Sequence, residues 1–335
     1  MEQKKIKQKN HCLDAVKGMA AIMVVFGHAV FPGQFGQMVF TLASVGVPIF
    51  FLVSGFYSYN EDSKVVYKKT PVKLQNIAKL TGMTCVLYFV WRMVYTCLKG
   101  NSLSSALHEF VPKKIFTLLI LADADVIMGS HLWFLFALIY AYITLLLLAK
   151  FDRIQWIYPV VVLTFIARIY MTANGNWHYS QNYWVDGLPF FFTGYYLHKK
   201  SSSISKIKNS TIGICIIFGI IVCLMKYVYP IPSYLLFNFY EIGSIVAAIM
   251  IFIYAHNNPK TGENSLMEIL GNRYSLYLYI SHVIVLYFVS IYDEKLFGEY
   301  DFYSVYEWLK PFLILFSSLL ISVLYYKIKH RKVKK

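Results

Sequence analysis

Three ionisable residues, Asp14, Lys17 and His28, interrupt the otherwise apolar segment LDAVKGMAAIMVVFGH at residues 13–28. On an α-helix the eleven-residue spacing between Lys17 and His28 is close to three turns, so both side chains lie on one face, about 16 Å apart along the axis. An imidazole takes up a proton near neutral pH, and an ammonium group holds an anion. The spacing therefore predicts proton transfer at His28 and an anion contact at Lys17.

A simpler interpretation of Asp14 and Lys17 is that they mark the end of a membrane span, where charged side chains are ordinary. His28 fits that interpretation less well, because it lies in the far half of the segment. Ionisable residues inside a span usually line a cavity or a pathway, so a functional role is favoured over a structural one for His28.

Further polar residues lie at similar depths in other apolar segments. His282 lies near the middle of one segment, with Ser275 and Tyr279 seven and three residues before it on the same helical face. His131 opens another segment and is followed by Trp133. Together they predict a polar pocket within the membrane. The catalytic candidates are His28, His282 and Glu241, and the substrate-binding candidates are His131, Trp133 and Tyr279.

Two other groups of charged residues allow a plainer interpretation. Arg92 and Arg168 fall near the ends of apolar segments, where long side chains can extend to the membrane surface. Basic residues near the end of the apolar segments opposite to His28 form a set that could bind phosphate groups, although such residues are expected on the cytoplasmic face of any membrane protein. The members of this set are Lys17, Lys69, Lys73 and Arg273.

The composition determines which elements must position these side chains. Hydrophobic residues make up 58% of the chain and charged residues 15%, and the mean hydropathy is +0.52, which excludes a soluble protein. A membrane-spanning helix needs about 20 apolar residues. We therefore predict an all-α, polytopic transmembrane helix bundle, a single domain over residues 1–335 with basic tails at about 1–11 and 327–335. The ten predicted spans are residues 13–31, 38–59, 76–98, 131–149, 155–172, 183–197, 210–229, 233–255, 273–292 and 308–326.

Lysine and arginine gather on one side of this arrangement, in both tails and in the loops near residues 64–73, 150–153 and 199–208. Cytoplasmic loops retain positive charge, so both termini are predicted to be cytoplasmic, which requires an even number of spans. The segment KIFTLLILADADVIMG at residues 114–129 is too short and too acidic to span, and we expect a loop on or dipping into the membrane surface. An eleventh span is the alternative.

The net charge of +15 is consistent with a lipid bilayer as the partner, because each basic residue beside an anionic leaflet gains about 1 kcal/mol. No nucleic-acid partner is expected, since no basic patch is interleaved with aromatic residues in a folded module. The five cysteines have no paired spacing, so we expect neither a disulfide framework nor a metal site.

Four segments together resemble the signature segments of acyltransferase family 3, the bacterial membrane acyltransferases that modify cell-envelope glycans. They have the family's order and spacing from about residue 12 to residue 292, and they read LDAVKGMAAIMVVFGH, VGVPIFFLVSGFYSY, SHLWFLFALI and LGNRYSLYLYISH. A basic residue, ten intervening residues and a histidine in the first span form the family's most characteristic pattern.

The resemblance implies transfer of an acyl group, usually acetyl, from cytoplasmic acyl-CoA to an acceptor beyond the membrane. It places the catalytic histidine at His28 and its basic partner at Lys17. The family usually has arginine at the second position, so lysine keeps the charge but loses a bidentate contact. Lys69 and Lys73 lie where the family carries basic residues after its second span.

Trp133 and His282 fall in the family's Trp-containing and His-containing segments. The expected partners are the lipid bilayer, acetyl-CoA or another acyl-CoA as donor, and a hydroxyl group of a cell-envelope glycan or lipid-linked sugar. The expected location is the bacterial cytoplasmic membrane, and a homo-oligomer is compatible with the sequence. No further domain follows the last span, so we expect the acceptor to meet the membrane domain itself.

The residues also suit acyl transfer on chemical grounds. A neutral imidazole can take the proton of a hydroxyl nucleophile, and His282, Tyr279 or Trp133 could stabilise the tetrahedral oxyanion. Cations near one face with a histidine about 16 Å deeper on one helical stripe fit an elongated CoA thioester. Whether His28 acts as a general base or carries the acyl group covalently stays open, with the general base favoured.

The rival hypothesis is a transporter or exporter that moves a small polar solute or a glycan through the same polar pathway without acyl transfer. Ten spans and intramembrane charges are compatible with it. The absence of a detectable inverted repeat and the presence of the four family segments favour the enzyme.

Overall fold

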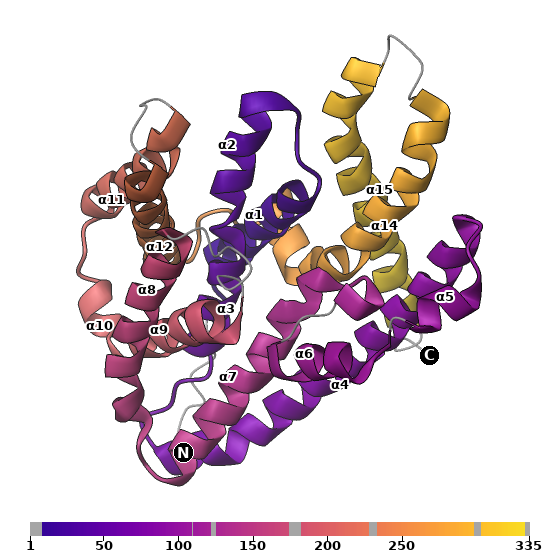
Figure 1. The fold of residues 1–335 in the computed structure, drawn as a ribbon. Helices are drawn as coiled ribbons and strands as arrows, with labels where there is room; N and C mark the ends of the chain where they lie inside the picture. The colour runs from indigo at the N-terminus through magenta and orange to yellow at the C-terminus, as the bar shows by residue number, and fades with distance from the viewer. Residues whose placement is uncertain are drawn as a thin grey trace.

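The computed structural model describes residues 9–108, 110–121, 125–173, 182–227, 233–297 and 303–331, and every regular element in these ranges is helical (Figure 1). The longer helices are α1 (His11–His28), α2 (Gly33–Ala43), α3 (Gly46–Phe56), α4 (Ser63–Leu98), α6 (Pro112–Leu121), α7 (Trp133–Lys150), α8 (Ile157–Ala173), α9 (Leu188–Lys199), α11 (Asn209–Leu224), α12 (Ser233–Asn257), α14 (Ser275–Phe297) and α15 (Tyr303–Arg331). The short elements are α5 (Leu103–His108), η1 (Asp125–Ile127), η2 (Ser130–Leu132), η3 (Ile154–Trp156), η5 (Tyr183–Gly187), α10 (Ser201–Ile204), η6 (Met225–Tyr227), α13 (Leu266–Ile269) and η7 (Leu270–Tyr274).

Seven helical segments within the described residues are long and apolar enough to cross a membrane, and each overlaps one of the predicted spans. They are Gly33–Phe56, Ser63–Leu98, Ser130–Lys150, Ile154–Thr172, Phe239–Asn257, Leu266–Asp293 and Ser304–Arg331. The three other predicted spans correspond to α1, to η5 with α9, and to α11, which are shorter or more polar. The prediction of an all-helical, multi-pass membrane protein is thus confirmed, whereas the count of ten and the sidedness of the termini stay predictions.

Three details differ from the prediction. The span expected at 38–59 consists of two helices, α2 and α3, because the chain turns between Ala43 and Gly46. The basic segment before the third span is not a loop but the first part of α4, whose N-terminus is capped by the Asp62 carboxylate accepting from the Lys64 N–H at 2.8 Å. The segment 114–129 is partly helical, within α6 and η1, and neither element is long enough to span.

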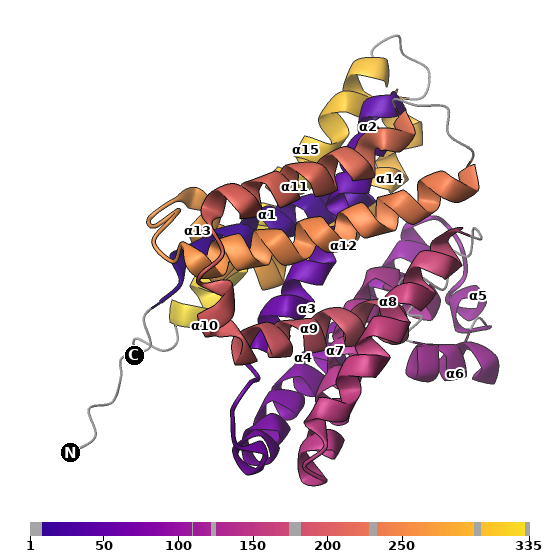
Figure 2. The same cartoon turned by 90° about the vertical axis from the view of Figure 1, so that its left-hand side faces the viewer.

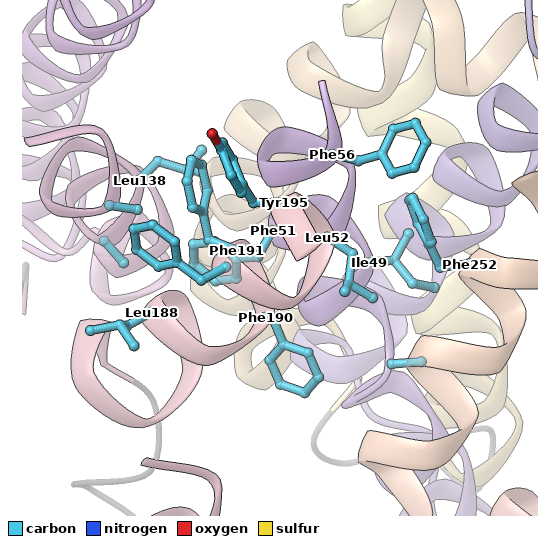
Figure 3. Close-up of a cluster of buried hydrophobic side chains, with 14 of the residues drawn as sticks. Ile49, Phe51, Leu52, Phe56, Leu138, Leu188, Phe190, Phe191, Tyr195 and Phe252 are labelled. Carbon is cyan, nitrogen blue, oxygen red and sulfur yellow. The ribbon is translucent and has the colours of Figure 1, made fainter. Parts of the chain in front are cut away.

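The apolar core lies where α3 and α9 cross, between α7 and α12 (Figure 3). Phe51 and Leu52 of α3 pack there with Phe191 of α9, and all three side chains are fully buried. Phe252 of α12 closes the same cluster on the side of Phe56, whose ring centroid lies 5.2 Å away. This core joins the α8–α12 half of the molecule to α3.

Helix α1 runs through the centre of the bundle, in contact with α2, α3, α12, α14 and α15 (Figure 2). Its closest approach is to α13 and η7, at two glycines that face each other's backbones. A Cβ atom on Gly18 would lie 2.2 Å from the Met267 carbonyl oxygen, and one on Gly271 would lie 1.8 Å from the Asp14 carbonyl oxygen. Only glycine permits this distance, as at other close helix contacts in membranes.

The beginning of α1 and the end of α15 lie at the same end of the bundle, since both contact the region where α14 begins. Glu268 accepts hydrogen bonds from Lys9 Nζ at 2.5 Å and from His11 Nδ1 at 2.7 Å, and the first of these raises the pKa of Lys9. Lys329 Nζ donates to the Tyr277 hydroxyl at 3.2 Å. This common end of the bundle, the α1-start end, is opposite to the end where α1 finishes at His28.

The α1 contact with η7 gives a first prediction. Gly271→Ala should lower stability by about 1–3 kcal/mol, because the added methyl group overlaps backbone that cannot move alone. Thermal unfolding of the detergent-solubilised protein measures the change. Gly213→Ala on α11 is the matched control, since nothing lies within 4 Å of a Cβ atom there. Equal melting temperatures for the two variants would contradict the assigned contact.

Candidate functional site

Three histidine side chains from separate parts of the chain meet where α1 ends, and of these His131 and His282 are buried whereas His28 is exposed. The ring centroid of His28 lies 5.2 Å from that of His282 and 6.0 Å from that of His131, and the last two are 5.2 Å apart. His28 is the last residue of α1, His131 lies in the η2 turn that precedes α7, and His282 lies within α14. We call these three residues the histidine cluster.

The local structure around His131 depends on hydrogen bonds from neighbouring helices. Tyr279 of α14 donates its hydroxyl to the His131 carbonyl oxygen at 2.6 Å. Arg92 of α4 donates from Nη1 to the carbonyl oxygen of Val126 at 2.5 Å, five residues before His131. Both bonds hold the irregular segment before α7, so the position of His131 is determined by α4 and α14.

The ring nitrogens of the buried histidines are poorly satisfied. His282 donates from Nδ1 to the Leu278 carbonyl oxygen at 3.1 Å, so in the neutral ring Nε2 carries a lone pair and no proton. Nε2 of His282 and both ring nitrogens of His131 have no hydrogen-bond partner among the described residues, although the two side chains are 0% and 3% exposed. Leaving a buried polar group unpaired costs about 1–3 kcal/mol, so this arrangement suits a ligand better than a structural core.

A small pocket of about 160 Å³ opens beside His28, at the end of the bundle opposite to the α1-start end. Its polar side chains are His28, Glu307 and Lys310, and its walls are completed by Ala29, Val30, Pro32 and Leu286. Lys310 forms an ion pair with Asp293 of α14. The small pocket therefore gives His28 access to a polar ligand.

A large cavity of about 1150 Å³ lies between α4, α14 and α15, with α3 and α7 contributing to one wall. Three lysines line it, Lys73 and Lys79 of α4 and Lys329 of α15, and the rest of the lining is mainly apolar. Lys73 donates to the Tyr57 carbonyl oxygen at 2.7 Å and to the Ser58 hydroxyl at 3.0 Å. The large cavity thus has cations near the α1-start end and apolar walls farther in.

The large cavity approaches the histidine cluster along α14. Ser281, which lines the cavity, directly precedes His282. Tyr88 follows the lining residue Leu87, donates to the Ile280 carbonyl oxygen at 2.7 Å and has its ring centroid 5.0 Å from that of His131. Tyr88 and one face of α14 therefore separate the large cavity from the histidine cluster.

The predicted cationic set is only partly brought together. Lys73 lines the large cavity, whereas Lys69 is exposed one turn earlier on α4. Lys17 Nζ lies 2.7 Å from Asp14 Oδ1 in a half-buried ion pair, and Arg273 is exposed in η7. None of Lys17, Lys69 and Arg273 lines the large cavity.

Sequence reasoning missed four charged residues that line the two cavities: Lys79, Glu307, Lys310 and Lys329. Lys79 and Lys310 fall inside predicted spans, where ionisable residues are rare and functional, so they could have been singled out by the argument applied to His28. Lys329 gave no such signal, because it lies in a basic tail. Glu307 precedes its span and looks like an ordinary loop residue.

Glu241 lies in a separate buried ion network and not in the histidine cluster. Arg168 of α8 donates from Nε to Glu241 Oε2 at 2.6 Å and from Nη1 to the Asp186 carboxylate, and the Thr172 hydroxyl donates to Glu241 Oε1 at 3.1 Å. The catalytic role predicted for Glu241 has no geometric support, since its oxygens already accept these bonds. The interpretation that Arg168 and Arg92 extend to the surface is wrong, because both side chains are buried.

The two other predicted substrate-binding residues are buried next to the histidine cluster. The Trp133 ring lies 6.0 Å from that of Phe51 and belongs to the apolar core. The Tyr279 hydroxyl already donates to the His131 carbonyl oxygen, so a second acceptor would have to replace that bond. Within the described residues no group of three or more His, Cys, Asp or Glu side chains has the geometry of a metal site.

The fold and the site define a multi-pass membrane protein with a histidine cluster between two cavities, in which His131 and His282 are buried. A family model described as an acyltransferase domain matches residues 10–327, nearly the whole chain. The chain belongs to this family, acyltransferase family 3, and its membership supports a transferase of acyl groups. No curated protein and no solved structure matches it.

The ion network gives a second prediction. Arg168→Met removes the cation that pairs with two buried carboxylates, and breaking such a buried pair costs about 3–5 kcal/mol. Glu241→Gln leaves Arg168 and Asp186 as a balanced pair, so this variant should lose less than half as much stability as Arg168→Met. Thermal unfolding of both variants measures the difference. A Glu241→Gln protein as unstable as Arg168→Met would contradict the structural role of the network.

Proposed function

We propose that the protein transfers an acyl group, usually acetyl, from cytoplasmic acyl-CoA to a hydroxyl group of a cell-envelope glycan or lipid-linked sugar outside the bacterial cytoplasmic membrane. The observation that carries the proposal is the histidine cluster, in which the buried and unpaired ring nitrogens of His131 and His282 lie next to His28, between the large cavity and the small pocket. Family membership supplies the reaction class.

The large cavity suits the donor. Acyl-CoA has several phosphate charges at one end, a long and less polar arm, and a reactive thioester at the other end. Lys79 and Lys329 place ammonium groups where the phosphates would bind, and the apolar walls accommodate the arm. The cavity follows α14 as far as Ser281 and Ile284, so a donor aligned with it brings its thioester towards His282.

The small pocket suits the acceptor, and the two cavities open far apart. Lys310 and Lys329 lie nineteen residues apart on α15, which corresponds to about 28 Å along a helix axis. That distance is close to the roughly 30 Å thickness of the hydrocarbon core of a bilayer. With the basic end of the bundle in the cytoplasm, as the positive-inside rule predicts, the small pocket faces outwards.

In the reaction, the acceptor oxygen attacks the thioester carbonyl carbon while His28 takes the hydroxyl proton as general base. A C–O bond forms, the carbonyl oxygen becomes an oxyanion, and the C–S bond then breaks as the proton passes to the sulfur of CoA. One ring nitrogen of neutral His131 carries a proton that has no acceptor among the described residues. We assign to it the hydrogen bond that stabilises the oxyanion.

His282 has a supporting role in this proposal. Its Nδ1 hydrogen bond to Leu278 fixes the tautomer in which Nε2 accepts a proton. With its ring 5.2 Å from that of His28, it can orient the general base or take the proton from it.

A third prediction tests the general base. His28→Gln should lower turnover about 10²- to 10⁴-fold, because glutamine keeps hydrogen bonding but cannot take the proton. Acyl-CoA affinity and thermal stability should change little, since the residue opens into the small pocket. Release of free CoA measures turnover, and His108→Gln, at an exposed site on α5, is the control. Normal turnover by a folded His28→Gln protein would refute this mechanism.

A fourth prediction concerns the donor. Lys79→Ala and Lys329→Ala should each weaken acyl-CoA binding by about fivefold or more, with smaller effects at high salt, because each removes a charge near the phosphates. Lys64→Ala, which removes an exposed charge on the same helix outside the large cavity, is the control. Titration with non-hydrolysable acetyl-CoA measures the affinity. Equal acyl-CoA affinities in all three variants would contradict the proposal that the donor binds in the large cavity.

Both measurements also separate the enzyme from the transporter alternative. A transporter would move a solute without releasing CoA, even as wild type. His28-dependent release of CoA by the purified protein would exclude it.

A further inference from the structure

We propose that the small pocket is an acceptor subsite for one uncharged, hydroxyl-rich sugar ring, and that Glu307 and the Lys310–Asp293 pair exclude acidic sugars from it. The inference rests on the proposed function and specifies its acceptor. It is drawn from the charges, the size and the position of the small pocket.

The charge of the small pocket carries the main argument. Lys310 would attract an anionic ligand if its ammonium group were uncompensated, but the Asp293 carboxylate forms an ion pair with it. Glu307 lines the same pocket and adds a second negative charge. The three side chains thus sum to one negative charge, and a carboxylate or phosphate brought between them meets net repulsion.

The polar groups that remain match hydroxyl groups. The Glu307 carboxylate accepts hydrogen bonds, and neighbouring hydroxyls of a sugar ring donate them. The Lys310 ammonium has three donor protons, so the ion pair with Asp293 leaves protons for a ring or hydroxyl oxygen. Hydrogen bonds with a charged partner are stronger than those between neutral groups, so a small site with few polar groups can bind one sugar ring.

The size and position of the small pocket limit the ligand further. A volume of about 160 Å³ is below the roughly 300–1,000 Å³ of ordinary small-molecule sites, so it holds one ring of a longer glycan. His28 forms part of its wall. A ring held by Glu307 and Lys310 therefore presents one hydroxyl group to the general base while the rest of the glycan stays outside.

The test uses the full-length protein, acetyl-labelled acetyl-CoA and two matched pairs of acceptors. The first pair is the methyl glycosides of glucose and glucuronic acid, and the second is the methyl glycosides of galactose and galacturonic acid. Each pair differs in charge while the ring stays the same. Label in the glycoside measures transfer, and label in free acetate measures hydrolysis. We expect the wild type to prefer each neutral glycoside to its uronide by at least about fivefold, the effect of one like charge at short range.

Two variants separate the contributions of the acidic side chains. Glu307→Gln should raise KM for the neutral glycoside about tenfold or more, since it removes a charged hydrogen-bond acceptor. Asp293→Asn frees the Lys310 charge, so it should reduce the preference for the neutral glycoside at least about fivefold without the same rise in KM. Glu61→Gln, at an exposed carboxylate outside the small pocket, is the control.

The outcomes distinguish this inference from the proposed function. Three results would each overturn the acceptor assignment without contradicting the proposed acyltransferase activity. They are equal transfer to neutral and acidic glycosides, transfer to neither despite His28-dependent hydrolysis, and an unchanged KM in Glu307→Gln. Absence of both transfer and His28-dependent hydrolysis in the wild type would instead refute the proposed function. Should Asp293→Asn fail to fold, the KM of Glu307→Gln and the wild-type preference still decide the question.

Discussion

The contact between Gly18 and Gly271 is the constraint on which the site depends. Each glycine lies so close to the other helix's backbone that a side chain would overlap a carbonyl oxygen. The contact fixes α1 against α13 and η7, just before α14, and nearly three turns farther along α1 it leaves His28 beside His282. Since α15 packs back along α14, the same contact determines where Glu307 and Lys310 meet His28.

Buried polar groups in this protein are of two kinds, and the difference indicates where a ligand belongs. Arg168, Asp186, Glu241 and Thr172 satisfy one another in a network that lines neither cavity. The ring nitrogens of His131 and His282 lie equally deep but are left unpaired among the described residues. A fold that can satisfy one buried network keeps the second unsatisfied at a cost in stability, which a ligand between the histidines would offset.

Composition and periodicity predict the helical membrane fold and most of its spans, because a bilayer leaves few alternatives for a chain this apolar. Ionisable residues within spans draw attention to His28 and His282, whose rings lie 5.2 Å apart in the structure. The pairing of Arg168 with Asp186 and Glu241 could not be foreseen, because it joins residues 18 and 73 positions apart, and neither could the break between α2 and α3. Such features arise from packing between residues far apart in the sequence, which a local sequence pattern does not report. Lys79 and Lys310 are a different case, since the rule that identified His28 applies to both.

In the proposed reaction, the position of Tyr88 determines how the two substrates meet. Its hydroxyl bonds to the α14 backbone beside the large cavity, and its ring packs on His131. A thioester in the large cavity therefore faces the histidine cluster across a single aromatic side chain and one side of α14. The small pocket has no such barrier, because His28 forms its wall directly. In the proposed reaction the acceptor therefore lies beside His28, whereas the donor must pass Tyr88 to reach the same point. In the proposed reaction, that asymmetry separates the thioester from the small pocket until the carbonyl carbon is next to the histidines, so transfer to the acceptor begins only there.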